Sequence, residues 1–351
     1  MLNNLNEMPN SSPNMILRGS LCTCELFSVP DLRPQPNFPA MNLARRAPAL
    51  FNFKKNVLAV AGCSGPGQHL TEIESIQFDG KNLEGNWKIC EMKAPNAFSC
   101  AAFCQFADDT AFAFGGFDGR HCTRQSLLLR PSLPYPSSVH SLEPLPYPSS
   151  VHSLEPLPYP SSVHSLEPLP YGVKNGVAVV ARDCGESKGR LLWLVGGWDG
   201  HRTLKTVFEY AFPEQNCSLK HILPYPIEGH SIAKSSVVAP QKAFIAGGFD
   251  GIGLRADFLA MDLRTGAVEL IAGIALEKPR ENHCSVIFGD GQGNEWLAII
   301  GGWDGHKALS DWEIFELLPD APWLRRTDIG PWGEKPATLA TARNRPATIL
   351  I

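Results

Sequence analysis

The sequence predicts an all-β fold: a β-propeller of six blades, each a four-stranded antiparallel sheet. One string, an apolar run followed by two glycines, an aromatic residue, Asp and Gly, recurs at intervals of about 50 residues. This period is typical of propeller blades and is longer than that of helical solenoids. Glycine (31 residues) and proline (30 residues) are both frequent, as expected for many short strands joined by turns. Helical periodicity with capping signals is absent from every long window of the sequence.

The repeated string occurs in four full copies and one degraded copy. They are AFAFGGFDG (Ala111–Gly119), LLWLVGGWDG (Leu191–Gly200), AFIAGGFDG (Ala243–Gly251), LAIIGGWDG (Leu297–Gly305) and the degraded LAVAGCSG (Leu58–Gly65). Glycine tolerates a positive φ and a close backbone approach, and Asp accepts backbone N–H groups in a turn. We therefore expect a structural role for Gly115, Gly116, Asp118, Gly196, Gly197, Asp199, Gly247, Gly248, Asp250, Gly301, Gly302 and Asp304. We also expect the glycine doublets on the innermost strands, where neighbouring backbones converge on the central channel.

Four strands can be placed around each doublet. Around Gly247 they are expected at Ser231–Ala239, Ala243–Ala246, Asp257–Asp262 and Ala267–Ala272. Around Gly301 they are expected at Cys284–Phe288, Leu297–Ile300, Asp311–Leu317 and Trp323–Ile329. The GDGQG string at Gly289–Gly293 lacks the Lys-Ser/Thr of a phosphate loop, so a hairpin turn is predicted there.

The two ends of the sequence each carry part of a blade. Leu21–Pro30 is predicted to be an outer strand, and Glu334–Ala342 and Pro346–Ile351 the first two strands of a new blade. Each part alone would expose an unpaired sheet edge. We therefore expect the N-terminal and C-terminal strands to pair, which closes the ring as a sixth blade, although the apolar end TILI also fits a truncated gene product. Residues 1–14 are expected to be a disordered tail, and residues 15–351 the propeller.

A tandem repeat lengthens the second blade. The unit PYPSSVHSLEPL occurs three times without a mismatch within residues 134–169. One copy is expected to form the fourth strand of the blade, and the sequence leaves open which one. The surplus is interpreted as a duplication tolerated in a surface loop, or as a recognition arm that displays Tyr147 and Tyr159.

Composition excludes several classes of protein. A net charge of −4 argues against nucleic acid or an anionic membrane as the main partner. No run approaches the roughly 18 apolar residues of a membrane helix, and the first residues lack the features of a signal peptide. A cytoplasmic location is predicted, with the nucleus as a second one. The 10 cysteines form no CxxC pair, so reduced thiols are expected rather than disulfides or zinc ligands, and no cofactor is predicted.

The glycine-glycine-aromatic-Asp-Gly string at this period resembles kelch repeats, over about residues 15–351. The openings PRENHCSVIF (Pro279–Phe288) and PIEGHSIAKSSVV (Pro226–Val238) are similar to the Pro-x-x-x-His blade start of that family. The family's later Tyr and Trp pair is mostly lost, with remnants at Trp87 and Trp323. The resemblance implies a non-catalytic protein-binding domain, such as a substrate receptor of a ubiquitin ligase or a cytoskeleton-associated adaptor. The alternative that it implies is a propeller enzyme of the epimerase or lyase type, acting on a small sugar or thio compound.

Such receptors and adaptors usually carry a BTB or F-box module. The residues before the first blade are too few and too polar for either module. Membership of a ligase would therefore need another tether or a longer product of the same gene.

The candidate binding site is the mouth of the ring, where the Asp-Gly turns are expected to lie together. The residues that follow these turns are Arg120, His121, His201, Arg202, His306 and Lys307, which we call the rim residues, while the remaining turn carries Ile252. Loops on a rigid scaffold commonly bind partners, and Arg matches carboxylates with two hydrogen bonds. We therefore expect a monomeric domain that binds a protein or peptide, with an acidic segment as the candidate ligand. No catalytic residue and no metal site are predicted. The sequence has no GxSxG motif, and His201 and His306 belong to different blades with no specific carboxylate pattern beside them.

Overall fold

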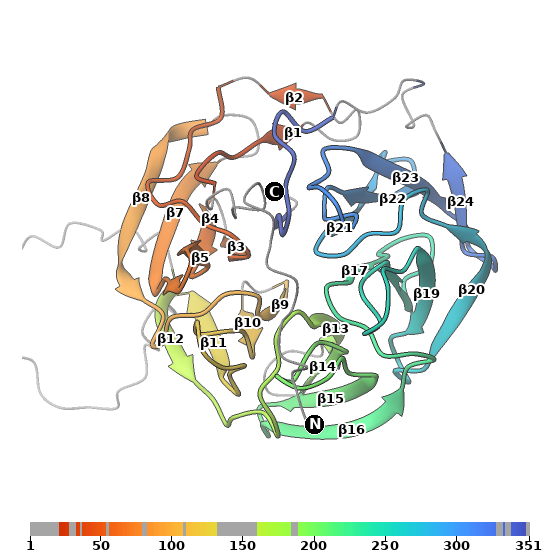
Figure 1. Cartoon of the computed structure of the whole chain (residues 1–351), viewed down its shortest axis with the longest axis horizontal. Coiled ribbons are helices and arrows are strands. Elements are labelled where there is room, and N and C mark those ends of the chain that lie inside the picture. Colours follow the sequence, from red (N-terminus) through yellow and green to blue (C-terminus); the bar gives the residue numbers. More distant parts are fainter. Residues whose placement is uncertain are drawn as a thin grey trace, which may run out of the picture.

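The computed structural model describes residues 21–27, 33–35, 37–53, 56–78, 83–107, 110–131, 160–183, 189–327, 333 and 338–348. These residues form five four-stranded antiparallel sheets, which stand around a ring as the blades of a propeller (Figure 1). In every blade the strands are hydrogen-bonded in sequence order. The all-β class and the four-stranded antiparallel blades are therefore confirmed.

The bounds of the strands are given blade by blade. The first blade contains β3 (Ala49–Phe53), β4 (Asn56–Val60), β7 (Glu72–Phe78) and β8 (Leu83–Lys93). The second contains β9 (Ala102–Gln105), β10 (Ala111–Phe114), β11 (Ser126–Pro131) and β12 (Pro160–Ser165). The third contains β13 (Val177–Asp183), β14 (Arg190–Val195), β15 (Thr206–Phe212) and β16 (Asn216–Ile222). The fourth contains β17 (Ser231–Lys234), β18 (Lys242–Ala246), β19 (Asp257–Asp262) and β20 (Val268–Ala275). The fifth contains β21 (Cys284–Gly289), β22 (Glu295–Ile300), β23 (Trp312–Leu317) and β24 (Leu324–Thr327). Two pairs of short strands lie outside the blades: β1 (Leu26–Phe27) with β2 (Pro34–Gln35), and β5 (Cys63–Gly65) with β6 (Gln68–His69).

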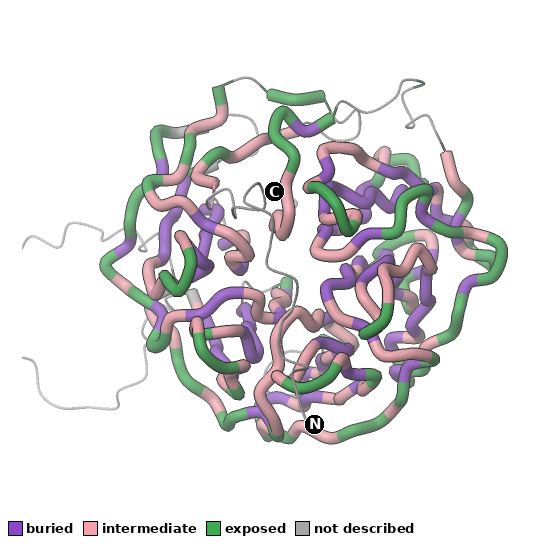
Figure 2. The backbone as a smooth tube through the Cα atoms, viewed as in Figure 1, coloured by how far each residue is buried: buried purple, intermediate pink, exposed green. Residues whose placement is uncertain are grey.

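The core of the ring is formed mainly by the second strands, which are sandwiched between neighbouring blades. Every residue of β10 and of β22 is buried, and Figure 2 shows burial concentrated in the inner parts of the blades and exposure on the outer strands. Apolar side chains on both faces are expected for strands covered on both sides. Aromatic rings join adjacent blades; Phe258 meets Phe315 with ring centroids 4.7 Å apart.

The glycine doublets do not lie on the innermost strands, so that prediction is wrong. The first strand of each blade lies nearest the channel, and the doublets end the second strands (Figure 1). A Cβ atom on Gly115 would lie 2.2 Å from the carbonyl oxygen of Val173, and one on Gly196 would lie 2.4 Å from that of Ile227. Val173 and Ile227 belong to the leading segment of the next blade, by which we mean the residues directly before its first strand. The close approach that requires glycine is therefore between adjacent blades and not across the channel.

The prediction of six blades is also wrong, because the described residues form five. The space between the fifth and first blades holds segments from the two ends of the chain, residues 21–27 and 338–348, which we call the seam (Figure 1). The predicted strand at Leu21–Pro30 is reduced to β1, and no strand forms within residues 338–348. Residues 28–32, 334–337 and 349–351 lie outside the described residues. Proline has no N–H group to donate to a sheet, and Pro346 lies in the C-terminal segment of the seam.

The third copy of the tandem unit supplies the fourth strand of the second blade. Residues Pro160–Ser165 of that copy form β12 and pair with β11. The first two copies consequently fall in the connection between β11 and β12. Residues 132–159, which include Tyr147 and Tyr159, lie outside the described residues, as do residues 1–20 with the predicted tail.

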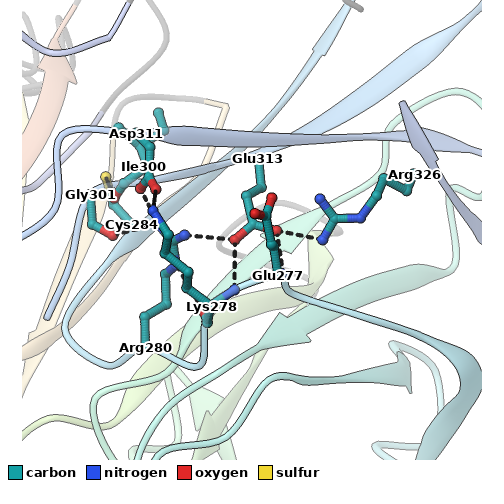
Figure 3. Close-up of polar contacts among 9 residues, drawn as sticks. All are labelled: Glu277, Lys278, Arg280, Cys284, Ile300, Gly301, Asp311, Glu313 and Arg326. Carbon is teal, nitrogen blue, oxygen red and sulfur yellow. Dashed lines mark hydrogen bonds and ion pairs between the residues drawn. The ribbon is translucent and has the colours of Figure 1, made fainter. Parts of the chain in front are cut away.

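An arginine is bound to a glutamate at three places around the ring, in the leading segments of the first and fifth blades and in the seam. Arg45 contacts Glu74 of β7 at 3.0 Å, and Arg280 contacts Glu313 of β23 at 2.6 Å. Figure 3 shows the second pair, in which Glu313 also accepts hydrogen bonds from Arg326 (2.6 Å) and from the N–H of Glu277 (2.8 Å). Buried ion pairs of this kind are stable only when additional hydrogen bonds satisfy them.

The third arginine of this kind lies in the seam. Arg343 contacts Glu25 at 2.8 Å, and the other oxygen of Glu25 accepts the N–H of Ala340 at 2.8 Å. In the described residues, the two ends of the chain thus meet through side chains rather than through a shared sheet.

Candidate functional site

The four Asp-Gly turns share one backbone geometry. In each, one carboxylate oxygen of the Asp accepts the N–H groups of the residues two and three positions later, at 2.7–2.9 Å. Burial raises the pKa of Asp118, Asp199, Asp250 and Asp304, but these backbone hydrogen bonds and nearby cationic side chains lower it below its ordinary value. The aspartates are therefore ionised, and their carboxylates are occupied by hydrogen bonds within their own turns.

The rim residues occupy the two positions whose N–H groups the aspartates bind. All six of them are exposed. Because each turn connects the second and third strands of its blade, up-and-down pairing places these turns on one face of the ring, which we call the mouth. The side chain of Arg202 lies 3.5 Å from Asp199, and Arg120 and Lys307 form no ion pair with any described residue. The structure therefore brings the predicted residues to a common face, in equivalent positions of three blades.

The other two blades depart from this arrangement. In the fourth blade Ile252 takes the exposed position, and Arg255 binds Asp250 at 3.3 Å. In the first blade the degraded copy forms the β5–β6 hairpin, which places His69 against Phe117 with ring centroids 5.6 Å apart. Exposed basic residues at the two positions that the turn Asp binds are thus found in the second, third and fifth blades.

Lys174 is a mouth residue that the sequence does not reveal. Its ammonium group lies 4.4 Å from the ring centroid of Phe117 and 4.6 Å from that of Trp198. The two rings belong to the turns of the second and third blades, so this cation links neighbouring turns. Nothing in the local sequence around Lys174 signals this role, because the rings come from distant turns.

A closed ring of backbone hydrogen bonds surrounds the channel beneath the mouth. Six residues take part, each with a positive φ: Ala47, Cys100, Asn175, Gly229, Asn282 and Arg345. The N–H of each donates to the carbonyl oxygen of its neighbour, at 2.6–3.4 Å, and the N–H of Ala47 closes the circle on Arg345. Five of these residues open the five blades, and Arg345 belongs to the seam. The seam therefore holds a place in the ring although it contains no four-stranded sheet.

A cavity of ≈ 230 Å³ lies in the channel at this ring. Its lining comes from the ring residues and from the beginnings of the first strands. Two histidines, His230 and His283, belong to the lining, and burial lowers the pKa of each to about 3. Both imidazoles are therefore neutral at physiological pH.

The described residues contain no cluster of three His, Cys, Asp or Glu side chains that could hold a metal ion. His201 and His306 lie in the turns of different blades, the third and the fifth. Nine of the cysteines lie in the described part of the chain, and none of these nine is in a disulfide. Among the same residues, no helix is long and apolar enough to cross a membrane.

Comparison with known proteins supports the fold. No protein-family model matches the chain, and none of the curated proteins matches it. Among solved structures it is similar to the structure of YjhT, with a TM-score of 0.58 and 11% sequence identity over 88% of each chain. At this identity the similarity shows the propeller fold alone.

Proposed function

We propose that this propeller is a non-catalytic scaffold that binds a protein or peptide at its mouth. The observation that supports this proposal is the equivalent display of cationic side chains by three rigid turns. Each turn is held by its own Asp, so Arg120, Arg202 and Lys307 are presented with little backbone freedom. A display of this kind suits an acidic segment, whose carboxylates can accept hydrogen bonds from Arg.

Within this proposal the chain is a kelch-type repeat protein of the cytoplasm or nucleus. The roles that fit are those of a substrate receptor for a ubiquitin ligase and of a cytoskeleton-associated adaptor. Both roles need a preformed surface and no chemistry at the mouth, which matches the structural use of the four aspartates.

The enzyme alternative receives less support from the channel. A propeller enzyme acting on a sugar or thio compound needs acid and base groups that converge on its substrate. The described lining of the channel cavity includes no Asp or Glu, and its two histidines titrate near pH 3. We therefore place protein binding first.

The test is a quantitative crosslinking capture from the native cell with the triple variant Arg120→Ala, Arg202→Ala, Lys307→Ala. The matched control is Lys88→Ala, Lys220→Ala, Arg264→Ala, which removes the same charge away from the mouth. Losing three exposed charge contacts is expected to weaken capture by about tenfold or more, and the wild-type interaction should weaken with added salt. If the mouth variant captures every partner as the wild type does, the mouth is not the binding surface.

A further inference from the structure

Several arginines around the ring are paired with a carboxylate, whereas the channel-ring residue Arg345 is not. Arg45, Arg280 and Arg343 each contact a glutamate, and Arg190 contacts Asp183 at 3.1 Å. Arg345 forms no ion pair within the described part of the chain. Its Nη1 atom instead donates to Asn175 Oδ1 at 2.6 Å and to Cys100 Sγ at 2.7 Å.

Arg345 is nevertheless a cation. Burial in the channel lowers its pKa, but Cys100, Glu281 and Glu228 act in the opposite direction and raise it above the ordinary value. The two glutamates do not lie within ion-pair distance of it. Glu228 is held by Asn175 Nδ2 at 2.7 Å and by Thr203 at 3.3 Å, and burial raises the pKa of Glu281. Charges inside proteins are normally paired or coordinated. The Arg345 guanidinium departs from this rule, because no described carboxylate lies within ion-pair distance of it.

The position of Arg345 makes the channel cavity the place for that counter-ion. Asn175 lies three places away in the ring of six, so the Arg345 side chain reaches across the channel. Both residues line the cavity, together with the amide of Asn282, and no Asp or Glu belongs to the described lining. Arg345 is therefore the permanently charged residue of this lining.

Part of the remaining wall of the cavity is apolar. They include Ala101, Phe103, Val177 and Ile232, which lie at or near the beginnings of the first strands of three blades. Ser285 also lines the cavity, and its hydroxyl oxygen has no hydrogen-bond partner among the described residues. The cavity thus combines a cationic, amide-rich part with walls that are partly apolar.

We propose that the channel binds a small organic anion, whose carboxylate pairs with Arg345 while a short apolar body lies against Phe103, Val177 and Ile232. An Arg–carboxylate pair is strong because two N–H groups can donate in parallel. A cavity of ≈ 230 Å³ is smaller than the pockets of about 300–1,000 Å³ that hold drug-sized ligands, so a short aliphatic or single-ring acid fits best. This site is separate from the mouth and does not depend on the proposed protein binding.

The experiment uses three probes of equal length: hexanoate, 1-hexanol and hexylamine. Isothermal calorimetry and thermal shift on the full chain should show binding of hexanoate, with at least tenfold weaker binding of the alcohol and the amine. Arg345→Gln should weaken hexanoate binding by at least tenfold, while Arg345→Lys retains part of it. The triple mouth variant should bind hexanoate as the wild type does, which separates this site from the mouth.

A second variant covers the case in which Arg345→Gln fails to fold. Val177→Thr keeps the size of the side chain but places a hydroxyl in the apolar wall, and should weaken hexanoate binding several-fold with Arg345 intact. The proposal is overturned if hexanoate does not bind the wild type at millimolar concentration, or if 1-hexanol binds as well as hexanoate. Unchanged binding of hexanoate to a folded Arg345→Gln variant would overturn it equally.

Discussion

The fifth blade and the seam use the same arginine contact in two different settings. Arg280 and Glu313 have side chains that are 0% and 5% exposed, whereas those of Arg343 and Glu25 are 14% and 16% exposed. The fifth blade surrounds its pair with four paired strands, and the seam surrounds its pair with short segments. The Arg–Glu contact can therefore form without a complete sheet. A complete sheet additionally excludes water from the two side chains.

The backbone confirms that the two settings are equivalent. In the fifth blade, the carbonyl oxygen of Leu309 accepts the N–H of Arg343, which is the paired arginine of the next position around the ring. In the seam, the carbonyl oxygen of Leu21 accepts the N–H of Arg45, again the paired arginine of the next position, and both distances are 2.9 Å. Two residues later stand Asp311 and Thr23, and both contact the arginine of their own setting. Glu313 and Glu25 lie two residues further on. The seam thus reproduces the arginine contacts of a blade, with a neutral residue in place of one carboxylate.

The largest expected effect comes from removing the arginine of the fifth blade. Arg280→Met leaves Glu313 buried with Arg326 as its remaining cationic partner, and should lower the free energy of unfolding by about 3 kcal/mol, the lower end of the range for broken buried pairs. Arg343→Met should cost about 1 kcal/mol, because the more exposed Glu25 can be hydrated. Urea unfolding followed by tryptophan fluorescence measures both. Equal losses would show that burial does not distinguish the two settings.

The second effect concerns the glycines that end the second strand of a blade and contact the neighbouring segment. Gly115 and Gly301 share a φ of +64°, so an Ala at either place carries a similar backbone strain of about 1–2 kcal/mol. A Cβ atom would lie 2.2 Å from the Val173 carbonyl oxygen at Gly115, but 3.1 Å from that of Arg343 at Gly301, where the neighbour is the seam. Gly115→Ala should therefore destabilise the protein by about 1–2 kcal/mol more than Gly301→Ala. The difference in urea midpoint tests this, and a larger loss for Gly301→Ala would mean that the seam is packed as tightly as a blade.

Local patterns predicted the regular parts of this fold well. The strand expected at Asp257–Asp262 coincides with β19, and the GDGQG string joins β21 to β22 as the predicted hairpin turn. The turn aspartates bind the backbone N–H groups that their residue type and position suggested. In each case the decisive interaction lies within a few residues in the sequence, where residue type reports directly on structure.

Interactions between distant segments could not be predicted in the same way. The six residues of the channel ring share a backbone conformation but not a single residue type, ranging from Ala47 to Arg345. Gly229 and Asn282 lie within the Pro-x-x-x-His openings, but residue type does not mark the six as a set. The sixth blade was expected because both ends resemble strands, yet strand propensity does not report whether partners are present at each edge. The rim residues were found because they follow a repeated string, while Lys174 lies outside that string.

The smallest expected effect is a difference in acid sensitivity between the two settings. Burial raises the pKa of Asp311, but hydrogen bonds and charge from Lys278 and Arg280 lower it below its ordinary value. A carboxylate with a lowered pKa stabilises the fold above its unfolded pKa of about 3.9, and this contribution is lost as pH falls through the folded pKa. Asp311→Asn should therefore lower the melting temperature at pH 6 and make its decline below pH 4 less steep.

Thr23→Asp is the converse change, because it gives the seam the carboxylate that the fifth blade has. Arg343 already donates to the hydroxyl of Thr23 at 3.2 Å, so an Asp there can reach the same guanidinium. The variant should raise the melting temperature at pH 6 by a few degrees and lose that gain below pH 4. Melting curves from pH 6 to pH 2 measure both variants. If Thr23→Asp lowers the melting temperature at pH 6, the seam does not provide a third place for the arginine contact of the blades.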